Sequence, residues 1–202
     1  PRRYEDRRRI VALGEARVGE PVLFLAIVRR AAARRFGGRQ SAEVVFEDGP
    51  ARVRALFFHF RGDPRERFAA GRRFYVAGTL TERDGERTIA HPDVEPADED
   101  SASSRRAGRV VAVYPTIPGV FPRTLERLVR DAIERVGLPP DVLPATLRER
   151  RGLASIGQAL GSAHDPPQDL DAASIERWNG GDPPWRRRLA YERLYLDALE
   201  NN

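Results

Sequence analysis

The chain has 202 residues, of which 41% are hydrophobic and 32% are charged, and its formal net charge is +5. All 35 basic residues are Arg and there is no Cys, which excludes a GxxxxGKS/T phosphate-binding loop, a Schiff-base lysine and thiolate nucleophiles or metal ligands. The three His residues are scattered, and the apolar runs are too short to span a membrane.

The basic excess is concentrated at the start of the chain. Residues 1–39 contain eleven Arg and four acidic residues, residues 40–98 nine and eleven, and residues 99–202 fifteen and fifteen. Such a concentration indicates a polyanionic partner, the alternative being a solubilising role. Residues 1–18 are expected to form a basic lead-in to the domain that follows. Because the chain begins with Pro1 rather than Met, we also expect it to be part of a larger protein.

Residues 19–98 are expected to form one β domain. Strand-like runs occupy residues 21–28, 42–46, 53–58, 73–81 and 87–90, with turn sequences at 47–50 and 83–86 and a basic hairpin loop at 29–40. A short helix over residues 63–70, with Pro64 in its first turn, lies between the third and fourth strands. This order is typical of an OB-fold, whose face and loops bind single-stranded nucleic acid or sugars.

The remaining residues are predicted to be a linker followed by helices. Residues 99–108 are small and polar, which favours a flexible linker with a solvated acidic cluster. Apolar residues recur at helical spacing from Leu125 to Val136, between Pro122 and Gly137. Shorter helices are expected over residues 144–151, 155–162 and 170–178, and a final one after Asp182. The sequence therefore predicts an α+β fold, a five-stranded OB-fold β-barrel (19–98) followed by a small helical segment (109–202).

Seven short sequences in order carry a resemblance to a known family. They lie at residues 1–7, 53–58, 71–78, 91–92, 113–115, 143–153 and 187–192. This set spans essentially the whole chain and resembles the start of the RecG family of branch-migrating DNA helicases. His91-Pro92 occupies a position where the family often has Asn-Pro.

The resemblance implies a function for each part. The barrel would be a wedge domain that recognises branched DNA, stalled forks and Holliday junctions, with an aromatic ring stacked on a base at the branch point. The helices would lead to two motor lobes of the same polypeptide that use ATP and Mg. The chain itself would hold no cofactor or metal and would not be an enzyme, whereas its parent would be an ATP-dependent DNA helicase of recombination and repair. The parent would be a bacterial, cytoplasmic, nucleoid-associated monomer without a membrane partner.

The resemblance also indicates which aromatic residue contacts DNA. Phe58 corresponds directly to the family's stacking Phe. The family's second stacking residue, a Tyr four positions later, corresponds to Gly62, so Phe60 is our candidate for the second ring. From the residues alone, strand alternation prevents Phe57 and Phe58 from both facing a core, so one of Phe58 and Phe60 is the platform or both pack beneath the helix.

Arginines in the predicted loops are the candidates for phosphate contacts, because guanidinium groups bind phosphate bidentately and stack on bases. Arg34, Arg35, Phe36 and Arg39 lie in the first hairpin loop, and Arg65 lies near another loop end. The full set of candidate DNA-binding residues is Phe58, Phe60, His59, Arg61, Arg34, Arg35, Phe36, Arg39 and Arg83.

Two other classes of function remain open. An OB-fold interaction or scaffold module without junction recognition is favoured by the altered aromatic pattern and by the nearly neutral barrel. A stand-alone enzyme has no support, because clustered His, Cys, Lys and a GxSxG motif are all absent. Salt-dependent DNA binding separates the DNA-binding module from the scaffold.

Overall fold

The computed structural model describes residues 1–36, 39–58, 60–97, 106–115, 117, 120 and 122–200. The chain divides into a sheet unit, Arg7–Arg109, and a helical unit, Pro1–Asp6 with Val110–Asn202. The strands are β1 (Arg3–Asp6), β2 (Pro21–Phe36), β3 (Arg39–Asp48), β4 (Ala51–Phe58), β5 (Arg73–Arg83), β6 (Glu86–Ala90), β7 (Asp93–Pro96) and β8 (Val110–Val113). The helices are the 3-10 turn η1 (Leu13–Glu15), α1 (Pro64–Arg67), α2 (Pro122–Val136), α3 (Ala145–Arg151), α4 (Ile156–His164), α5 (Ala172–Asn179) and α6 (Pro184–Glu200).

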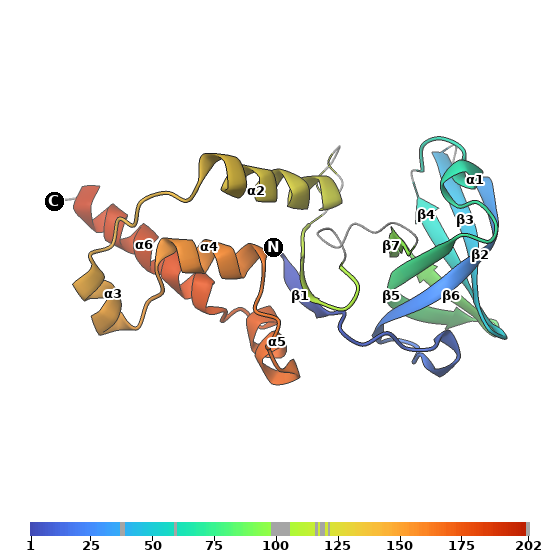
Figure 1. Ribbon diagram of the computed structural model, residues 1–202, viewed down its shortest axis with the longest axis horizontal. Coiled ribbons are helices and arrows are strands. Elements are labelled where there is room, and N and C mark those ends of the chain that lie inside the picture. Colours follow the sequence, from blue (N-terminus) through green and yellow to red (C-terminus); the bar gives the residue numbers. More distant parts are fainter. Residues whose placement is uncertain are drawn as a thin grey trace. The chain divides into compact units, whose positions relative to one another are not determined.

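Strand β2 closes the sheet because it pairs with two neighbours. Its first half, residues 21–27, runs antiparallel to β5, and its second half runs antiparallel to β3. Strand β3 pairs with β4, β4 pairs in parallel with β6, and β6 returns to β5. The sheet thus curls back on itself in an OB-like arrangement, drawn in blue to green in Figure 1. The predicted α+β fold, an OB-like sheet followed by helices, is confirmed.

The strands are longer and more numerous than the sequence predicts. Strand β7 adds a sixth strand to this sheet, where five are predicted. The prediction of a loop over residues 29–40 is wrong, because β2 continues to Phe36 and β3 begins at Arg39. A register shift between Val28 and Arg30 marks a β-bulge in β2. Arg and Ala have little intrinsic strand preference, so this extension depends on cross-strand pairing rather than on local propensity.

The inward faces of the strands form one apolar core. Helix α1 covers one end of the curled sheet, and its N-cap Asp63 accepts a hydrogen bond from the Arg65 N–H at 2.9 Å. The turn between β5 and β6 is the predicted one: Asp84 (φ 54°) and Gly85 (φ 74°) both have the positive φ of a tight hairpin turn. The most deeply buried core residues include Leu13, Phe24, Val44, Phe46, Ala55, Val76, Leu80 and Ile89.

The first residues of the chain belong to the helical unit. Strand β1 pairs antiparallel with β8, and Tyr4 in β1 is only 3% exposed. The Tyr4 hydroxyl donates a hydrogen bond to the Ala163 carbonyl at 3.0 Å, and its ring meets Trp178 edge-to-face at 5.1 Å. Burial raises the pKa of Tyr4. Residues 1–18, expected as a basic lead-in, thus supply a core residue to each unit, Tyr4 to one and Leu13 to the other.

The predicted linker over residues 99–108 lies mostly outside the described residues. Its last residues are packed: the Arg106 N–H donates to the Glu95 carboxylate at 3.0 Å, and the Gly108 N–H donates to the Arg7 carbonyl at 2.7 Å. Residues 109–202 begin with strand β8 and continue as the predicted helices. Helix α2 ends at Val136 and is followed by the predicted Gly137 (φ 78°), and α6 begins at Pro184. Among the described residues, no helix is both long and apolar enough to cross a membrane.

A buried arginine joins three segments of the helical unit. Arg188 in α6 is fully buried and donates to the Ala154 carbonyl (3.0 Å), to Glu192 (2.5 Å) and to Asp141 (2.6 Å). Desolvation acts to raise the pKa of Asp141, but hydrogen bonds from the Ile156 N–H and from Arg188 outweigh it and hold that pKa below its ordinary value. The network therefore depends on Asp141 being ionised.

We expect Arg188→Met to lower the free energy of unfolding of the helical unit by about 3 kcal/mol, because two carboxylates lose their shared cation in a largely buried site. Both tryptophans, Trp178 and Trp185, lie in this unit, so urea denaturation followed by Trp fluorescence measures it. The control is Arg193→Met, at an exposed cation paired with Asp197, whose cost is about 0.5 kcal/mol. Equal losses in both variants would contradict a special role for the buried group.

Candidate nucleic-acid interface

Strand β4 ends in two phenylalanines that lie on opposite faces of the sheet. Phe57 stacks on Phe68, with ring centroids 5.3 Å apart and an interplanar angle of 27°, and packs against the core. Phe58 is 43% exposed. The alternation of a β-strand therefore separates a structural ring from one that is accessible for stacking.

Phe60 belongs with the structural rings. Its ring centroid lies 6.2 Å from Phe57 and 6.1 Å from Phe68, and the side chain packs against the core. These rings and their neighbours form what we call the aromatic cluster: Phe46, Phe57, Phe60, Phe68 and Phe74. Of the two predicted platforms, Phe58 thus presents more ring surface, and Phe60 as the second stacking residue remains a prediction.

The register of β2, β3 and β4 places Phe58 in one row with an arginine. Arg34 lies opposite Ser41, and Ser41 lies opposite Phe58. Residues opposite one another in a sheet share a face, so Arg34 and Phe58 project from the same side, which we call the outer face. Two interstrand steps separate them, a distance of about 10 Å.

The cations of the outer face share one carboxylate. Glu43 lies 3.2 Å from Arg30 and 3.4 Å from Arg34, and both guanidinium groups stay largely exposed. Glu43 itself is buried, at 9% exposed, whereas both guanidinium groups are accessible, so a phosphate group can reach either arginine while Glu43 keeps the other. The face is therefore able to bind an anion, with part of its charge already balanced.

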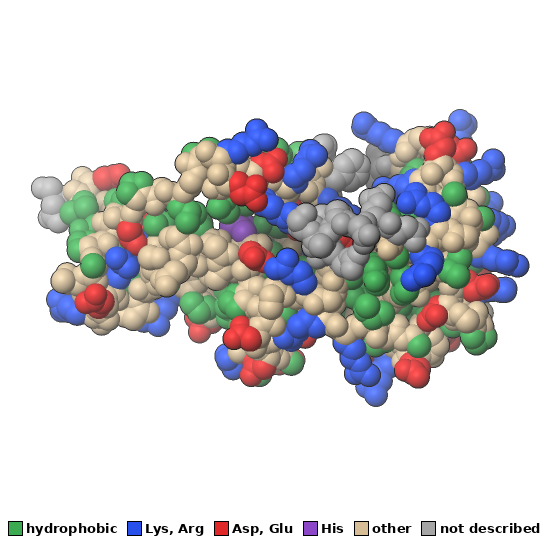
Figure 2. All heavy atoms as spheres, in the orientation of Figure 1, with side chains coloured by type: hydrophobic (Ala, Val, Ile, Leu, Met, Phe, Trp, Pro, Cys, Tyr) green, Lys and Arg blue, Asp and Glu red, His purple; other side chains and the backbone are tan. Residues whose placement is uncertain are grey.

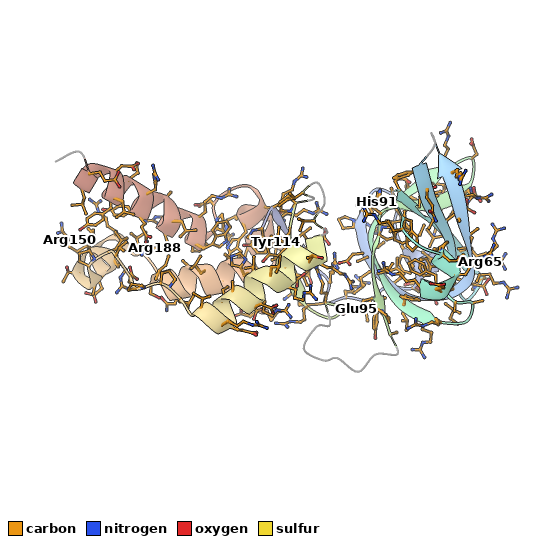
Figure 3. The ribbon with its side chains drawn as sticks, turned by 90° about the horizontal axis from the view of Figure 1, so that it is seen from above. Arg65, His91, Glu95, Tyr114, Arg150 and Arg188 are labelled. Atoms are coloured by element: carbon orange, nitrogen blue, oxygen red, sulfur yellow. The ribbon has the colours of Figure 1, made fainter. Side chains whose placement is uncertain are left out.

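The other sequence candidates divide into three groups. Arg35 and Arg61 are exposed near the Phe58 end of the sheet, where the Gln40 side chain donates to the Gly62 carbonyl at 2.8 Å. Arg83 adjoins the β5–β6 turn at the opposite end, and Figure 3 shows Arg65 well away from His91, on another side of the sheet unit. His59 and the side chains of Phe36 and Arg39 lie outside the described residues.

The sequence did not single out His91 as a site residue. It is exposed, and Figure 3 labels it on the sheet unit. Its ring lies edge-to-face with Phe58, with centroids 4.9 Å apart at 62°. Its φ is 47°, in the left-handed region, and its N–H donates to the Leu56 carbonyl at 2.8 Å. Asn and His are enriched in that region. The Asn that the family often has at this position therefore indicates a left-handed backbone, but it does not indicate the contact between the His91 and Phe58 rings.

Charge distinguishes the two units. The sheet unit contains 21 Arg and 15 acidic residues, whereas the helical unit contains 14 and 15. Figure 2 shows arginine side chains along the edge of the sheet unit formed by β2, β3 and α1. Among the described residues, no three His, Cys, Asp or Glu side chains are grouped to hold a metal ion. The features of the sheet unit are those of a surface for an anionic polymer.

Comparison with known proteins agrees with this geometry. A family model, the RecG wedge domain, matches residues 1–136. The chain belongs to the RecG wedge domain family. The resemblance predicted from the sequence is thereby confirmed.

The relatives carry the RecG name and are much longer than this chain. The ATP-dependent DNA helicase RecG of Escherichia coli K12 is 29% identical over 201 residues, covering 98% of this chain and 28% of that protein. The same helicase from Aquifex aeolicus is 25% identical over 98% of this chain and 25% of its own length. A solved structure of RecG bound to a three-way DNA junction has a TM-score of 0.61 at 22% identity, over 97% of this chain and 25% of that chain. The chain thus spans about a quarter of these proteins and shares the RecG fold.

The two candidate platforms differ in what they contribute to stability. Phe60→Ala is expected to destabilise the sheet unit by about 2 kcal/mol, below the 3–5 kcal/mol of a fully buried Phe because the ring is only partly buried. Phe58→Ala should cost less than about 1 kcal/mol, because its ring is exposed. Hydrogen exchange of the sheet amides measures both, and a larger loss in Phe58→Ala would reverse the assignment.

Proposed function

We propose that this chain is the branched-DNA-binding wedge of a RecG-like ATP-dependent DNA helicase acting in recombination and repair. The observation that carries the proposal is Phe58, an exposed ring at the end of a core strand, in register with Arg34 on the outer face. Family membership and the likeness to a RecG that was solved on a three-way junction support it.

The chemistry of this surface suits an unpaired base beside a phosphate. Stacking of a base on an aromatic side chain is worth about 1–3 kcal/mol and is insensitive to base identity. Arg30 and Arg34, on the same face as Phe58, supply donors for phosphate oxygens nearby. Bases in an intact duplex are already stacked, so a free ring favours DNA whose strands separate, as at a fork or a junction.

The motor belongs to the rest of the parent protein in this proposal. There, lobes of the same polypeptide hydrolyse ATP with Mg, while this chain binds DNA and holds no cofactor of its own. The parent works as a monomer on chromosomal DNA, at the bacterial nucleoid in the cytoplasm. The wedge is therefore tested by binding, not by catalysis.

One observation favours the alternative of a scaffold module. Glu43 already pairs with Arg30 and Arg34, which reduces the net charge of the outer face. A scaffold would bind DNA weakly, with little dependence on salt and none on branching.

The test is equilibrium binding of the 202-residue chain to a three-way junction, a duplex and a single strand over a series of salt concentrations. We expect the junction to bind about tenfold more tightly than the duplex, an advantage within the range of one base stack. Each phosphate contact should add about −0.9 to the slope of log K against log salt. Phe58→Ala should remove most of the junction preference and leave the slope unchanged.

Ile27→Ala is the matched control, because Ile27 is another large apolar side chain exposed on the sheet unit, at 48%. It should bind all three DNAs as the wild type does. Equal, weak and salt-independent binding of the wild type to all three would instead support the scaffold.

A further inference from the structure

The sheet unit exposes two aromatic rings that touch each other. Of the aromatic and His side chains described within Arg7–Arg109, Phe58 and His91 are exposed, whereas Phe57, Phe60 and Tyr75 are partly buried. Accessible ring surface is therefore concentrated at one place on this unit. That place lies at the ends of β4 and β6, which run parallel.

The backbone holds His91 firmly beside Phe58. The His91 N–H donates to the Leu56 carbonyl, two residues before Phe58, so the backbone of β4 positions both side chains. A positive φ in a residue other than Gly persists where the surrounding structure stabilises it, and such residues occur often at binding sites. Pro92, which follows, is buried and restricts the chain further.

The angle between the rings makes a two-sided contact surface. At 62° the rings present faces that are far from parallel, so a base stacked on one ring lies beside the other. The imidazole can donate or accept a hydrogen bond at its nitrogens, which the phenyl ring cannot do. Phe58 thus supplies stacking, and His91 supplies a polar group for the edge of the same base.

We propose that His91 is a DNA-contacting residue that, with Phe58, binds one unstacked base at the branch point. This inference rests on the proposed function and adds a residue and a ligand to it. The nucleotide stacks on Phe58 and is contacted by the His91 imidazole, while Arg34 in the same sheet row faces its phosphate backbone.

The decisive variant is His91→Asn. Asn tolerates the left-handed backbone, so the substitution removes the ring without straining the turn. Binding of the whole chain to a three-way junction is compared with binding to the same junction carrying abasic nucleotides at the branch point. We expect His91→Asn to weaken binding to the intact junction about fivefold, within the range of a base contact, and to have no effect on the abasic junction.

A second comparison separates direct contact from support of Phe58. If His91 touches the base, His91→Asn weakens junction binding in the Phe58→Ala background as well, by about twofold or more. If it only holds Phe58 in place, the substitution has no effect in that background, and the proposal is wrong. An equal effect on intact and abasic junctions would also overturn it, because the contact would then be to the backbone. His91→Gly fits the same φ and removes the polar group as well as the ring, so it should weaken binding to the intact junction at least as much as His91→Asn and leave binding to the abasic junction unchanged.

Failure of this inference is distinguishable from failure of the proposed function. Wild-type preference for the junction over the duplex tests the function alone, whatever His91 does. A junction preference in His91→Asn as large as that of the wild type would overturn the role of His91 and leave the wedge intact.

Discussion

The register of β4 between β3 and β6 fixes where the candidate DNA contacts of the sheet unit lie. Val53 and Ala55 of β4 are fully buried on the core side of the sheet. The alternate positions of the strand, including Phe58, therefore project from the outer face. A slip of one residue would bury Phe58 and expose Phe57 together with the core positions. The same apolar contacts that stabilise the fold thus keep one ring accessible, and the parallel pairing with β6 brings His91 beside it.

Much of the sheet could be predicted because its signals are local. The strand around Phe46, the turn after Asp48 and the turn at Asp84-Gly85 are encoded by β-branched and aromatic residues next to Gly. The extension of β2 through Arg34 and Arg35 has no such signal, because pairing with β3 determines it. Strands β1 and β8 are four residues each and pair across more than a hundred residues of sequence, which no local pattern indicates.

The site was predictable in proportion to how local its contacts are. Phe58 follows from family resemblance and from the alternation of one strand. The packing of Phe60 depends on Phe68, which follows α1 as its C-cap, and the sequence alone does not indicate that contact. The position of His91 needs both the parallel pairing of two strands and a left-handed residue, so the sequence marked it only as a departure from the family.

The linear distribution of charge overstates how basic the outer face is. Of the eleven Arg in residues 1–39, Arg2 and Arg3 belong to the helical unit, and Arg7 is nearly buried against Asp93 at 2.6 Å. Arg30 and Arg34 share Glu43. Electrostatic attraction to phosphates acts on every form of DNA, more strongly on a duplex than on a single strand, so a strongly charged face alone would not select branched DNA. Partial neutralisation by Glu43 weakens that common attraction. Under the proposed function, discrimination between DNA structures would then rest on the exposed rings at the ends of β4 and β6.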